Sequence, residues 1–488
     1  MEKKLNRAWA LIIGTVLIAL AILIGQSSAQ ADSSVASIKE RGVLKVALSP
    51  DYPPFEFQSK AGGQSEDAGI DIQVAQKIAK DLGVKLQIMN MSFASVLVAV
   101  EIGKADLAIG GINPTPARRQ NVAFSDYYYN GGQVFLLTKE GAKQLKKASQ
   151  LSGKTIGAQS SSLQYKLAKD KYTDSKVVGM DKSSDLVLAL KGKKIDAMGI
   201  EKPVAEAYIE NDHSLTMIPA DYNLSADETG AAIAAAKGND ELINEVNKSI
   251  NEIKSQNLMK TYLKNAAHKL KDTTANTSML HYWQYFLNGL LYTLYISVWA
   301  IIGGMILGAI LSLMKMSAWK VLNWPAVSFI EVVRGTPIMV QILLVYFGLG
   351  LLINIPALTA GIIAVTLNSA AYVAEIIRGG INAVNKGQFE AAQSLGLSKK
   401  DQYRFVIFPQ AIKNIWPALG NEFISIIKES SIVSIIGVTD LVYELNIVKA
   451  DTYRGVAPIV VVMVIYFIVT FGLGRLLGHF ERKMKYGN

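Results

Sequence analysis

The stretch Glu390-Ala-Ala-Gln-Ser-Leu-Gly-Leu-Ser-Lys-Lys-Asp-Gln-Tyr-Arg-Phe-Val-Ile-Phe-Pro-Gln410 is a polar segment between two strongly apolar regions. It carries five charged residues, one glycine and one proline. Such a segment cannot lie in the hydrocarbon core of a bilayer, because its charges and polar groups would lose their water. The sequence therefore predicts an organised loop on the aqueous side of a membrane domain.

The apolar regions around this loop predict membrane-spanning helices. There are five runs between residues 281 and 488: Phe286–Met314, Ile338–Leu352, Ile355–Ile377, Ile415–Ile427 and Val456–Leu477. Runs of this kind predict an all-α membrane domain of about five transmembrane helices. From His281 onward the chain has 16 Lys and Arg against 10 Asp and Glu, and most of the basic residues lie at the ends of the runs. This positive-inside pattern places the Glu390 loop in the cytoplasm and accounts for +6 of the net charge of +10 without nucleic acid.

The N-terminus has the layout of an export signal. Lys3, Lys4 and Arg7 precede the apolar run Ala8–Gly25, and small residues follow up to Ala31. Residues 1–31 are therefore predicted to be a signal peptide or an uncleaved signal anchor, and both alternatives stay open. In either case the region that follows, residues 33–270, is expected outside the cytoplasm. Residues 271–280 read as a polar linker.

The lack of cysteine and the small number of histidines exclude several kinds of disulfide, catalytic and metal sites. The chain contains no cysteine and only four scattered histidines. Disulfides, thiol catalysis and zinc–thiolate sites are thus excluded, and no metal site is predicted.

The exported region alternates strands and helices. Leu44–Leu48 and Ala105–Gly110 read as strands, and Asp71–Leu82 reads as an amphipathic helix with Asp71 as its N-cap and Gly83 as its C-cap. This alternation predicts an α/β domain with a largely parallel sheet.

Three quoted stretches in this region carry a resemblance: Gly69-Ile-Asp-Ile-Gln-Val-Ala75, Ala105-Asp-Leu-Ala-Ile-Gly-Gly-Ile-Asn-Pro-Thr-Pro-Ala-Arg118 and Asn121-Val-Ala-Phe-Ser-Asp126. They resemble the amino-acid-binding proteins of bacterial ABC importers. The resemblance implies a periplasmic-binding-protein-like domain whose two lobes close over one amino acid. Its crossover strands are expected near Tyr129–Gly132 and Glu228–Ala231.

The resemblance also implies a ligand site. Arg118 would hold the ligand carboxylate, since a guanidinium matches two oxygens, and Glu201 would face the ammonium. The remaining expected ligand-binding residues are Tyr52 and Phe93 as an aromatic sandwich, Gly111 and Asn113, and the amides of Ser161 and Ser162 at a helix N-terminus. Glu201 and Asn113 depart from the commoner Asp and Ser or Thr of that family.

The side-chain specificity is not fixed by these residues. Ser49 occupies the position where an acid would select a cationic side chain, which favours a polar uncharged amino acid such as glutamine or asparagine. Asp51 lies two residues further on, so a cationic ligand stays open.

The Glu390 loop resembles the ATPase-coupling loop of ABC-importer permeases, on Glu390-Ala391-Ala392, Gly396 and Phe408-Pro409. The alanines would let two short helices pack closely, Gly396 would form the turn, and Pro409 would end the second helix. The stretch Phe329-Ile-Glu-Val-Val-Arg-Gly-Thr-Pro337 resembles a second signature, that of amino-acid permeases.

Together, the two resemblances imply the binding and permease subunit of an ATP-driven amino-acid importer in the cytoplasmic membrane, with the binding domain outside. A separate ATPase subunit would carry ATP and Mg, and the permease domain would form a homodimer. The chain itself would not be an enzyme, because Leu151-Ser-Gly-Lys-Thr155 lacks the first glycine of a phosphate-binding loop. Asn368 and Glu375 are candidates for the translocation path. The alternatives are a ligand-gated channel and a membrane-bound amino-acid sensor.

Overall fold

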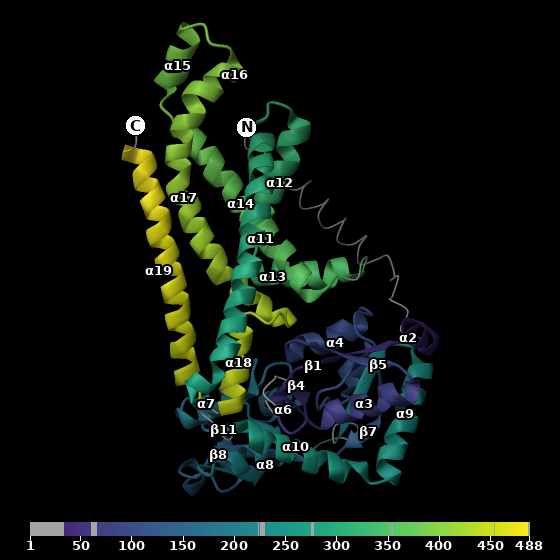
Figure 1. The fold of residues 1–488 in the computed structure, drawn as a ribbon. Helices are drawn as coiled ribbons and strands as arrows, with labels where there is room; N and C mark the ends of the chain where they lie inside the picture. Colours follow the sequence, from purple (N-terminus) through teal and green to yellow (C-terminus); the bar gives the residue numbers. More distant parts are fainter. Residues whose placement is uncertain are drawn as a thin grey trace.

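The computed structural model describes residues 34–59, 66–222, 224, 230–274, 278–351, 353, 355–452 and 454–486. The predicted signal segment, residues 1–31, lies outside the described residues. Figure 1 shows an α/β domain at one end of a set of long helices. The predicted fold class, a two-lobed α/β domain followed by an all-α domain, is confirmed.

Lobe 1 of the α/β domain is built on a five-stranded sheet in the order β5-β1-β6-β13-β7. The strands are β1 Val43–Leu48, β5 Lys85–Asn90, β6 Leu107–Ala108, β7 Val122–Tyr129 and β13 Ala231–Ala236. A small sheet beside it holds β2 Asp51–Tyr52, β3 Glu56–Ser59 and β4 Glu66–Ala68. The helices are α2 Val35–Arg41, α3 Ile70–Leu82, α4 Phe93–Glu101, α5 Pro116–Arg119 and α9 Asp240–Ser255. Strand β1 pairs in parallel with β5 and β6, whereas β13 is antiparallel to β6 and β7.

Helix α3 begins one residue earlier than predicted. Its N-cap is Gly69, and the expected N-cap, Asp71, is the second residue of the helix and is fully buried. The carboxylate of Asp71 points into the domain and accepts a hydrogen bond from the Gly111 amide at 3.1 Å. A distant tertiary contact therefore overrides the local capping preference. The C-cap is Gly83, as predicted, with φ of 74°.

Lobe 2 contains the second five-stranded sheet, in the order β10-β9-β11-β8-β12. Its strands are β8 Gln133–Thr138, β9 Thr155–Gln159, β10 Lys176–Met180, β11 Ala197–Glu201 and β12 Leu215–Pro219. Its helices are α6 Leu163–Lys171, α7 Ser183–Lys191 and α8 Lys202–Asn211, with short 3₁₀ turns at Gly141–Lys143 and Ala148–Leu151. The chain crosses between the lobes from β7 to β8, where predicted, and returns from β12 to β13. Part of the second predicted crossover, residues 225–229, lies outside the described residues.

The polar stretch before the helical domain is more ordered than a plain linker. Helix α10 spans Leu258–Thr274 and therefore includes the first four residues of the predicted linker. Residues 275–277 lie outside the described residues, and a 3₁₀ turn at Met279–Tyr282 leads into the next helix. The predicted linker, residues 271–280, therefore begins within the last turn of this helix.

The helical domain follows. Its α-helices are α11 Trp283–Met316, α12 Lys320–Gly335, α13 Ile338–Leu343, α14 Ala357–Asn382, α15 Lys386–Ser394, α16 Lys399–Asp401, α17 Phe408–Glu429, α18 Leu441–Thr452 and α19 Val456–Tyr486. Other helical turns are η5 Leu344–Gly348, η6 Leu349–Leu351, η7 Gln402–Ile407 and η8 Ser430–Ile436, of which η5 and η7 are π-helical.

Within the described residues, three helices are long and apolar enough to cross a membrane, or up to five if each bent pair is one span. The straight ones are α11, α14 and α19. The predicted second span, Ile338–Leu352, begins at the second arm of a bent pair, because Lys320–Gly335 and Ile338–Gly348 meet at a bend of 113°. The predicted fourth span is part of a longer segment that bends by 56° before α18. Apolar runs revealed where helices lie but not where they bend.

Close contact between α11 and α14 depends on glycines of α11. A Cβ on Gly304 would lie 2.6 Å from the Ser369 Oγ, and one on Gly308 would lie 2.6 Å from a Val373 methyl carbon and 2.9 Å from the Ala370 carbonyl oxygen. Small residues of this kind let helices in a membrane approach each other closely.

We expect Gly308→Ala to lower the thermal midpoint of the purified protein, because overpacking at a tight contact costs about 1–3 kcal/mol. Gly478→Ala on α19 is the matched control, since a Cβ there meets nothing within 4 Å and alanine favours the helix. Thermal unfolding of both variants in the same detergent gives the comparison. Equal midpoints for the two variants would contradict the proposed packing.

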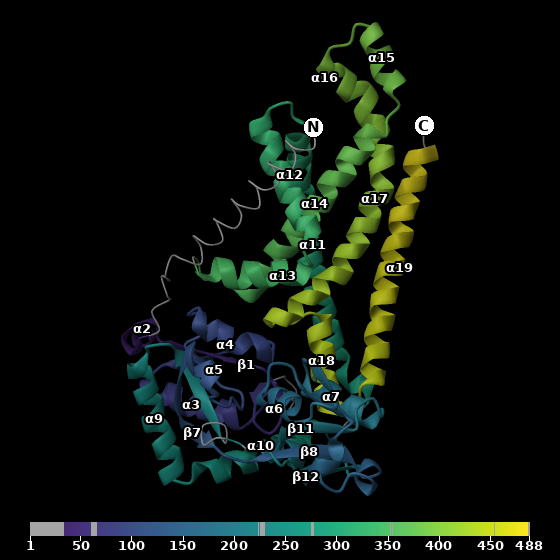
Figure 2. The same ribbon diagram turned by 180° about the vertical axis from the view of Figure 1, so that it is seen from behind.

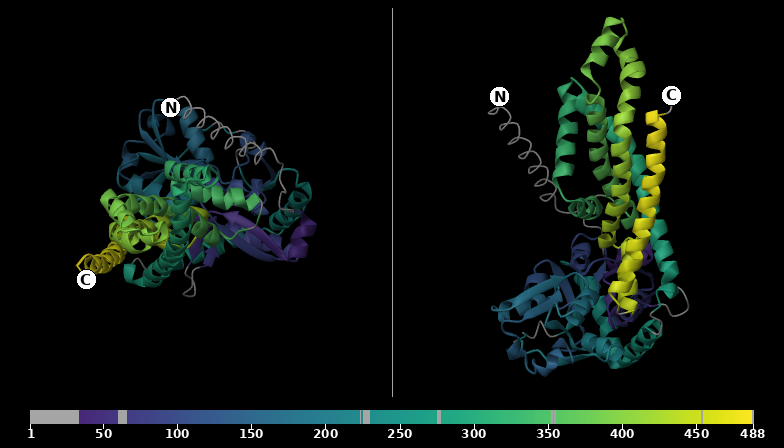
Figure 3. Two further views of the ribbon diagram at one scale, coloured as in Figure 1. Left: turned by 90° about the horizontal axis from the view of Figure 1, so that it is seen from above. Right: turned by 90° about the vertical axis from the view of Figure 1, so that its left-hand side faces the viewer.

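The α/β domain and the Glu390 loop lie at opposite ends of the helical domain. Figures 1 and 2 place the α/β domain at one end of the helices and α15 and α16 at the other, beyond the C-terminal end of α19. The right-hand view of Figure 3 shows the same separation from the side. The Glu390 loop is therefore as far from the α/β domain as the helical domain allows.

Candidate functional site

The candidate ligand site is a cleft between the two lobes. Its lining comes from both lobes and comprises Tyr52, Phe93, Gly110, Gly111, Asn113, Gln159, Ser162, Leu163 and Gln164. Five of the eight predicted ligand-binding residues are in this set. The lobes are closed on each other, and the cavity left between these residues has a volume of about 10 Å³. Side chains of the two lobes therefore bond directly across the cleft.

Arg118 bridges the lobes. It lies in the short helix α5, where the Thr115 hydroxyl accepts a hydrogen bond from the Arg118 amide at 3.4 Å. Its Nη1 donates to the carbonyl oxygen of Asn113 at 2.8 Å, and its Nη2 donates to the carbonyl oxygen of Ser161 in lobe 2 at 2.9 Å. The guanidinium lies 5.8 Å from the centre of the Phe93 ring. Burial lowers the pKa of Arg118 to about 10, so the group stays charged at neutral pH.

Glu201 meets Asn113 from the opposite lobe. The Asn113 Nδ2 donates to the Glu201 Oε1 at 3.1 Å, and the Glu201 amide donates to the Tyr52 hydroxyl at 3.4 Å. Glu201 ends β11 and is the N-cap residue of α8, so the strand end fixes its backbone. Burial raises the pKa of Glu201 to about 7, against the opposing effect of the Asn113 hydrogen bond.

The serine pair is placed at a helix N-terminus as expected, but its amides are used differently. Ser162 caps α6, and its Oγ accepts from the Tyr165 amide at 3.1 Å. The Ser162 amide donates to the Gln159 carbonyl oxygen at 3.1 Å, so it closes a turn in this state of the cleft. Ser161 has φ of 65°, which presents its carbonyl oxygen to Arg118. The expected amide donors are thus near Arg118 but are not both free.

Two buried acids near the cleft were not predicted as site residues. Glu56 is 1% exposed and Asp71 is fully buried. A Cβ on Gly110, which lines the cleft, would lie 3.1 Å from the Glu56 Oε1. Burial, followed by the charge of Asp71, raises the pKa of Glu56 well above its usual range. The sequence signal was weak, since the two acids come from separate segments and only the fold brings them together.

Asp51, the acid that left a cationic ligand open, already has partners. Its Oδ1 accepts from the Ser49 hydroxyl at 2.7 Å, and its Oδ2 accepts from the Ser183 amide in lobe 2 at 3.1 Å. Lys182 lies 3.7 Å from the same carboxylate. Asp51 therefore holds the lobes together in the closed form.

The two translocation-path candidates lie on α14 but have different surroundings. Asn368 donates to the Gln341 Oε1 at 3.1 Å, and Gln341 in turn donates to the Val333 carbonyl oxygen at 2.7 Å. Asn368 thus supports the bend between α12 and α13. The structure does not bring it together with Glu375.

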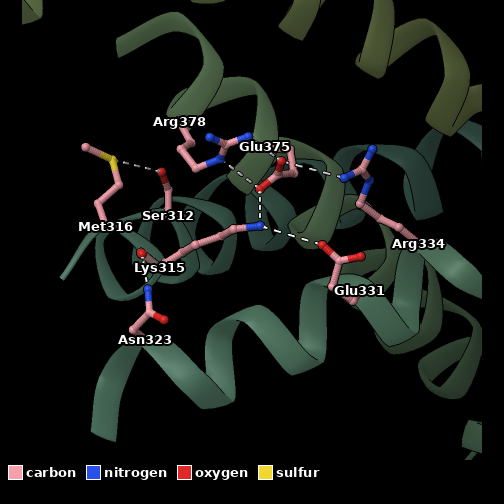
Figure 4. A network of polar contacts seen from close by, with 8 residues as sticks. All are labelled: Ser312, Lys315, Met316, Asn323, Glu331, Arg334, Glu375 and Arg378. Atoms are coloured by element: carbon pink, nitrogen blue, oxygen red, sulfur yellow. Dashed lines mark hydrogen bonds and ion pairs between the residues drawn. The ribbon is translucent and has the colours of Figure 1, made fainter. Parts of the chain in front are cut away.

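Glu375 is the centre of an ion-pair cluster (Figure 4). It lies 2.8 Å from the Lys315 Nζ, 2.8 Å from the Arg378 Nη2 and 3.6 Å from the Arg334 Nη1. Glu331 is a second acid, 3.9 Å from Lys315. The cluster joins α11, α12 and α14, and the pairing of Glu375 with Arg378 that the sequence left open is present.

The Glu390 loop forms two short helical pieces. Ala392 of α15 is buried, whereas Glu390 and Ala391 are exposed. Gly396 has φ of 75° directly after α15, a conformation that suits glycine at the end of a helix. The prediction for Pro409 was wrong: the helical segment continues from Lys399 through a π-turn into α17. Pro409 lies in the first turn of α17, where a missing N–H costs little.

Fold and site together define a class: a two-lobed solute-binding domain joined to a membrane permease domain. Residues 44–266 match the bacterial extracellular solute-binding proteins, family 3, and residues 300–486 match the binding-protein-dependent transport system inner membrane component. The chain belongs to these binding-protein-dependent transport systems. The predicted fusion of binding domain and permease is therefore confirmed.

Individual relatives match one domain each. The permease domain is 43% identical over 203 residues to the arginine transport system permease protein ArtQ of Bacillus subtilis, which covers 41% of this chain and 93% of that protein. It is 38% identical to the glutamine transport system permease protein GlnP of Escherichia coli K12, over 40% of this chain and 90% of that protein.

The binding domain is similar to a solved structure, an amino acid ABC transporter substrate-binding protein from Streptococcus pneumoniae bound to L-arginine. The two are 35% identical with a TM-score of 0.47, and the match covers 48% of this chain and 97% of that protein.

The comparisons make this chain an inner-membrane transport protein. They give no support to the ligand-gated channel or the sensor considered from the sequence.

Proposed function

We propose that this chain captures an α-amino acid outside the cell and passes it through its own membrane domain, driven by a separate ATPase subunit. The observation that carries the proposal is the cleft, where the cation Arg118 and the acid Glu201 approach from opposite lobes beside Tyr52 and Phe93. A free amino acid carries one carboxylate and one ammonium, and both must keep charged partners when they leave water.

The bonds across the closed cleft support this assignment of charges. The two Arg118 donors go to carbonyl oxygens, which are weaker acceptors than a carboxylate. A ligand carboxylate would replace them with a bidentate, charge-assisted pair. Glu201 would exchange the Asn113 amide for the ligand ammonium. Gly111 lets the Tyr52 ring pack closely on the backbone of the cleft, since a Cβ there would lie 3.3 Å from the ring.

The arrangement of the helical domain supports the rest of the proposal. The α/β domain and α15–α16 lie at opposite ends of the helices, which is the arrangement that an outward-facing binding domain and a cytoplasmic coupling loop require. We assign α15, with Glu390, Ala391 and Ala392, and the Gly396 turn as the docking element for the ATPase, which would hold ATP and Mg. A homodimer of the permease domain is the simplest pathway.

Uptake measurements test the function directly. The full chain is co-expressed with its ATPase subunit and reconstituted in liposomes. It is expected to transport labelled L-glutamine, L-asparagine or L-arginine only when ATP is present on the side of the membrane that carries the ATPase subunit. Relatives named for glutamine and arginine make these the first amino acids to compare. Flux of amino acid or ions without the ATPase would overturn the proposal.

Ligand binding is expected to weaken as the pH falls below about 7. The pKa of Glu201 is raised to about 7 by burial, so the acid takes up a proton below this pH and loses its attraction for an ammonium. Affinity should then fall by up to about tenfold per pH unit until the lower pKa of the bound state is passed. Titration calorimetry of the full chain between pH 5 and 8 measures the slope.

Glu201→Gln is the control for this pH profile. The variant keeps Glu56, whose pKa burial also raises, and Asp71, whose pKa burial raises to about 6, so any remaining slope reports these two acids. The expected result is weaker binding with a flatter profile. A Glu201→Gln variant with the same slope as the original chain would contradict the role of Glu201.

A further inference from the structure

Lobe 1 contacts the permease domain through a buried lysine. Lys104 follows α4 and is only 6% exposed. Its ammonium donates to the carbonyl oxygens of Tyr346 at 2.8 Å and Ile355 at 3.2 Å, and it lies 3.2 Å from the centre of the Tyr346 ring. Nearby, the Ser92 amide donates to the Ile435 carbonyl oxygen at 3.4 Å. All of these binding-domain groups belong to lobe 1.

Lobe 2 contacts the permease domain through α7. Asp185 of α7 forms an ion pair with Lys449 of α18. Lys449 is 6% exposed, whereas the Asp185 side chain is 36% exposed. One turn further along α7, Leu188 packs so closely on Gly455 that a Cβ there would lie 2.3 Å from it. Lobe 2 thus presents one face of one helix to the permease.

The same helix also closes the cleft. Its first residue, Ser183, donates its amide to Asp51 of lobe 1 at 3.1 Å, and Lys182 before it lies 3.7 Å from that carboxylate. Asp185 is only two residues beyond this contact. The position of α7 against the permease is therefore fixed by the same movement that brings lobe 2 onto lobe 1.

The two contacts have different electrostatic requirements. Lys104 is satisfied by backbone carbonyls of the permease and needs nothing from lobe 2. Lys449 is a buried cation, and within the described residues it forms its ion pair with Asp185. Loss of the contact with Asp185 is costly, because the buried Lys449 charge then loses its compensation. The permease therefore favours the position of α7 that closure produces.

We propose that each binding domain docks on its own permease chain through a division of roles between its lobes. Lys104 anchors lobe 1 in both the open and the closed state, and the Asp185–Lys449 pair detects closure of lobe 2. The inference rests on the proposed function, since closure is taken to follow amino-acid binding. By reciprocity, docking of α7 strengthens ligand binding by the same factor by which the ligand strengthens docking.

Crosslinking in the full chain tests this division, because the chain contains no cysteine. Leu188→Cys with Gly455→Cys reports the lobe 2 contact, and Ser92→Cys with Ile435→Cys reports the lobe 1 contact. Each pair is treated with a short bifunctional thiol reagent in lipid nanodiscs, with and without L-glutamine or L-arginine. Binding of the same amino acids is measured separately by calorimetry.

The expected result is a lobe 2 crosslinking rate that rises at least fivefold with the bound amino acid, and a lobe 1 rate that changes less than twofold. Equal responses of the two pairs, or a lobe 2 pair that ignores an amino acid shown to bind, would overturn the inference while leaving the proposed function intact. Failure of every amino acid to bind would overturn the proposed function and this inference with it.

Exchanging the charges of Asp185 and Lys449 separates a loss of their pairing from a folding defect, because the double variant restores the pair. Asp185→Lys and Lys449→Asp should each weaken amino-acid binding to the full chain several-fold and lower the lobe 2 crosslinking rate, and the double exchange should restore both. Exchanging the exposed pair Lys193 and Glu140 in lobe 2 is the matched control, since both side chains are at least 70% exposed. A double exchange that behaves like the worse single variant would contradict the specific pairing.

Discussion

Arg118→Lys should weaken amino-acid binding about 100-fold, which corresponds to roughly 2.7 kcal/mol, although the positive charge is kept. The guanidinium donates in two directions, to Asn113 in lobe 1 and to Ser161 in lobe 2. A carboxylate with two oxygens can take both donors at once, and a lysine ammonium cannot reproduce this planar fork. Calorimetry of the full chain with the amino acid that shows the strongest uptake measures the loss.

Arg119→Lys is the matched control for this prediction. Arg119 is the next residue of α5, and its guanidinium lies 5.6 Å from the centre of the Phe124 ring. Its replacement should change the affinity less than threefold. Equal losses for the two variants would show a general defect of α5, and an unchanged affinity in Arg118→Lys would remove Arg118 from the ligand site.

Sequence patterns located the cleft but not its present bonding. Arg118, Asn113 and Glu201 are 88 residues apart at the most, and only the resemblance to a two-lobed fold indicated that they meet. The structure brings them together with Tyr52 and Phe93. Their role toward a ligand stays a prediction, because the groups now bond to each other.

Residues whose position depends on distant partners were harder to predict. Asp71 stands where an N-cap is common, yet its carboxylate is turned toward the Gly111 amide. Glu56 carries no local signal, because its burial depends on how the small sheet packs on lobe 1. Local propensity predicts how a residue fits its own stretch of chain. The positions of these two acids are determined by tertiary contacts with distant residues.

The helical domain shows the same division. Gly396 was predicted as a turn because a left-handed conformation is a local requirement, and its φ of 75° agrees. Pro409 was expected to end a helix, but it lies in the first turn of α17, directly after the π-turn Gln402–Ile407, and the helical segment continues. The 113° bend after α12 is supported by Gln341 and Asn368, which no hydropathy profile reports.

Glu375→Gln should destabilise the permease domain by about 2–4 kcal/mol, because it leaves three cations without their shared acid. The Glu375 side chain is 17% exposed and the Lys315 side chain 16%, so water compensates only part of the loss. The expected result is a clearly lower thermal midpoint of the purified chain. Uptake per folded transporter should remain, since the cluster joins three helices and its acid is fully engaged.

Arg378→Gln separates this structural role from a place in the translocation path. That variant removes one cation and leaves Glu375 with Lys315 at 2.8 Å and Arg334 at 3.6 Å, so its midpoint should fall far less than in Glu375→Gln. Asp at position 375 keeps the charge and should recover part of the stability. A Glu375→Gln variant with normal stability and lost uptake would instead place this carboxylate on the path of the amino acid, because a hub of ion pairs cannot be neutralised without cost to the fold.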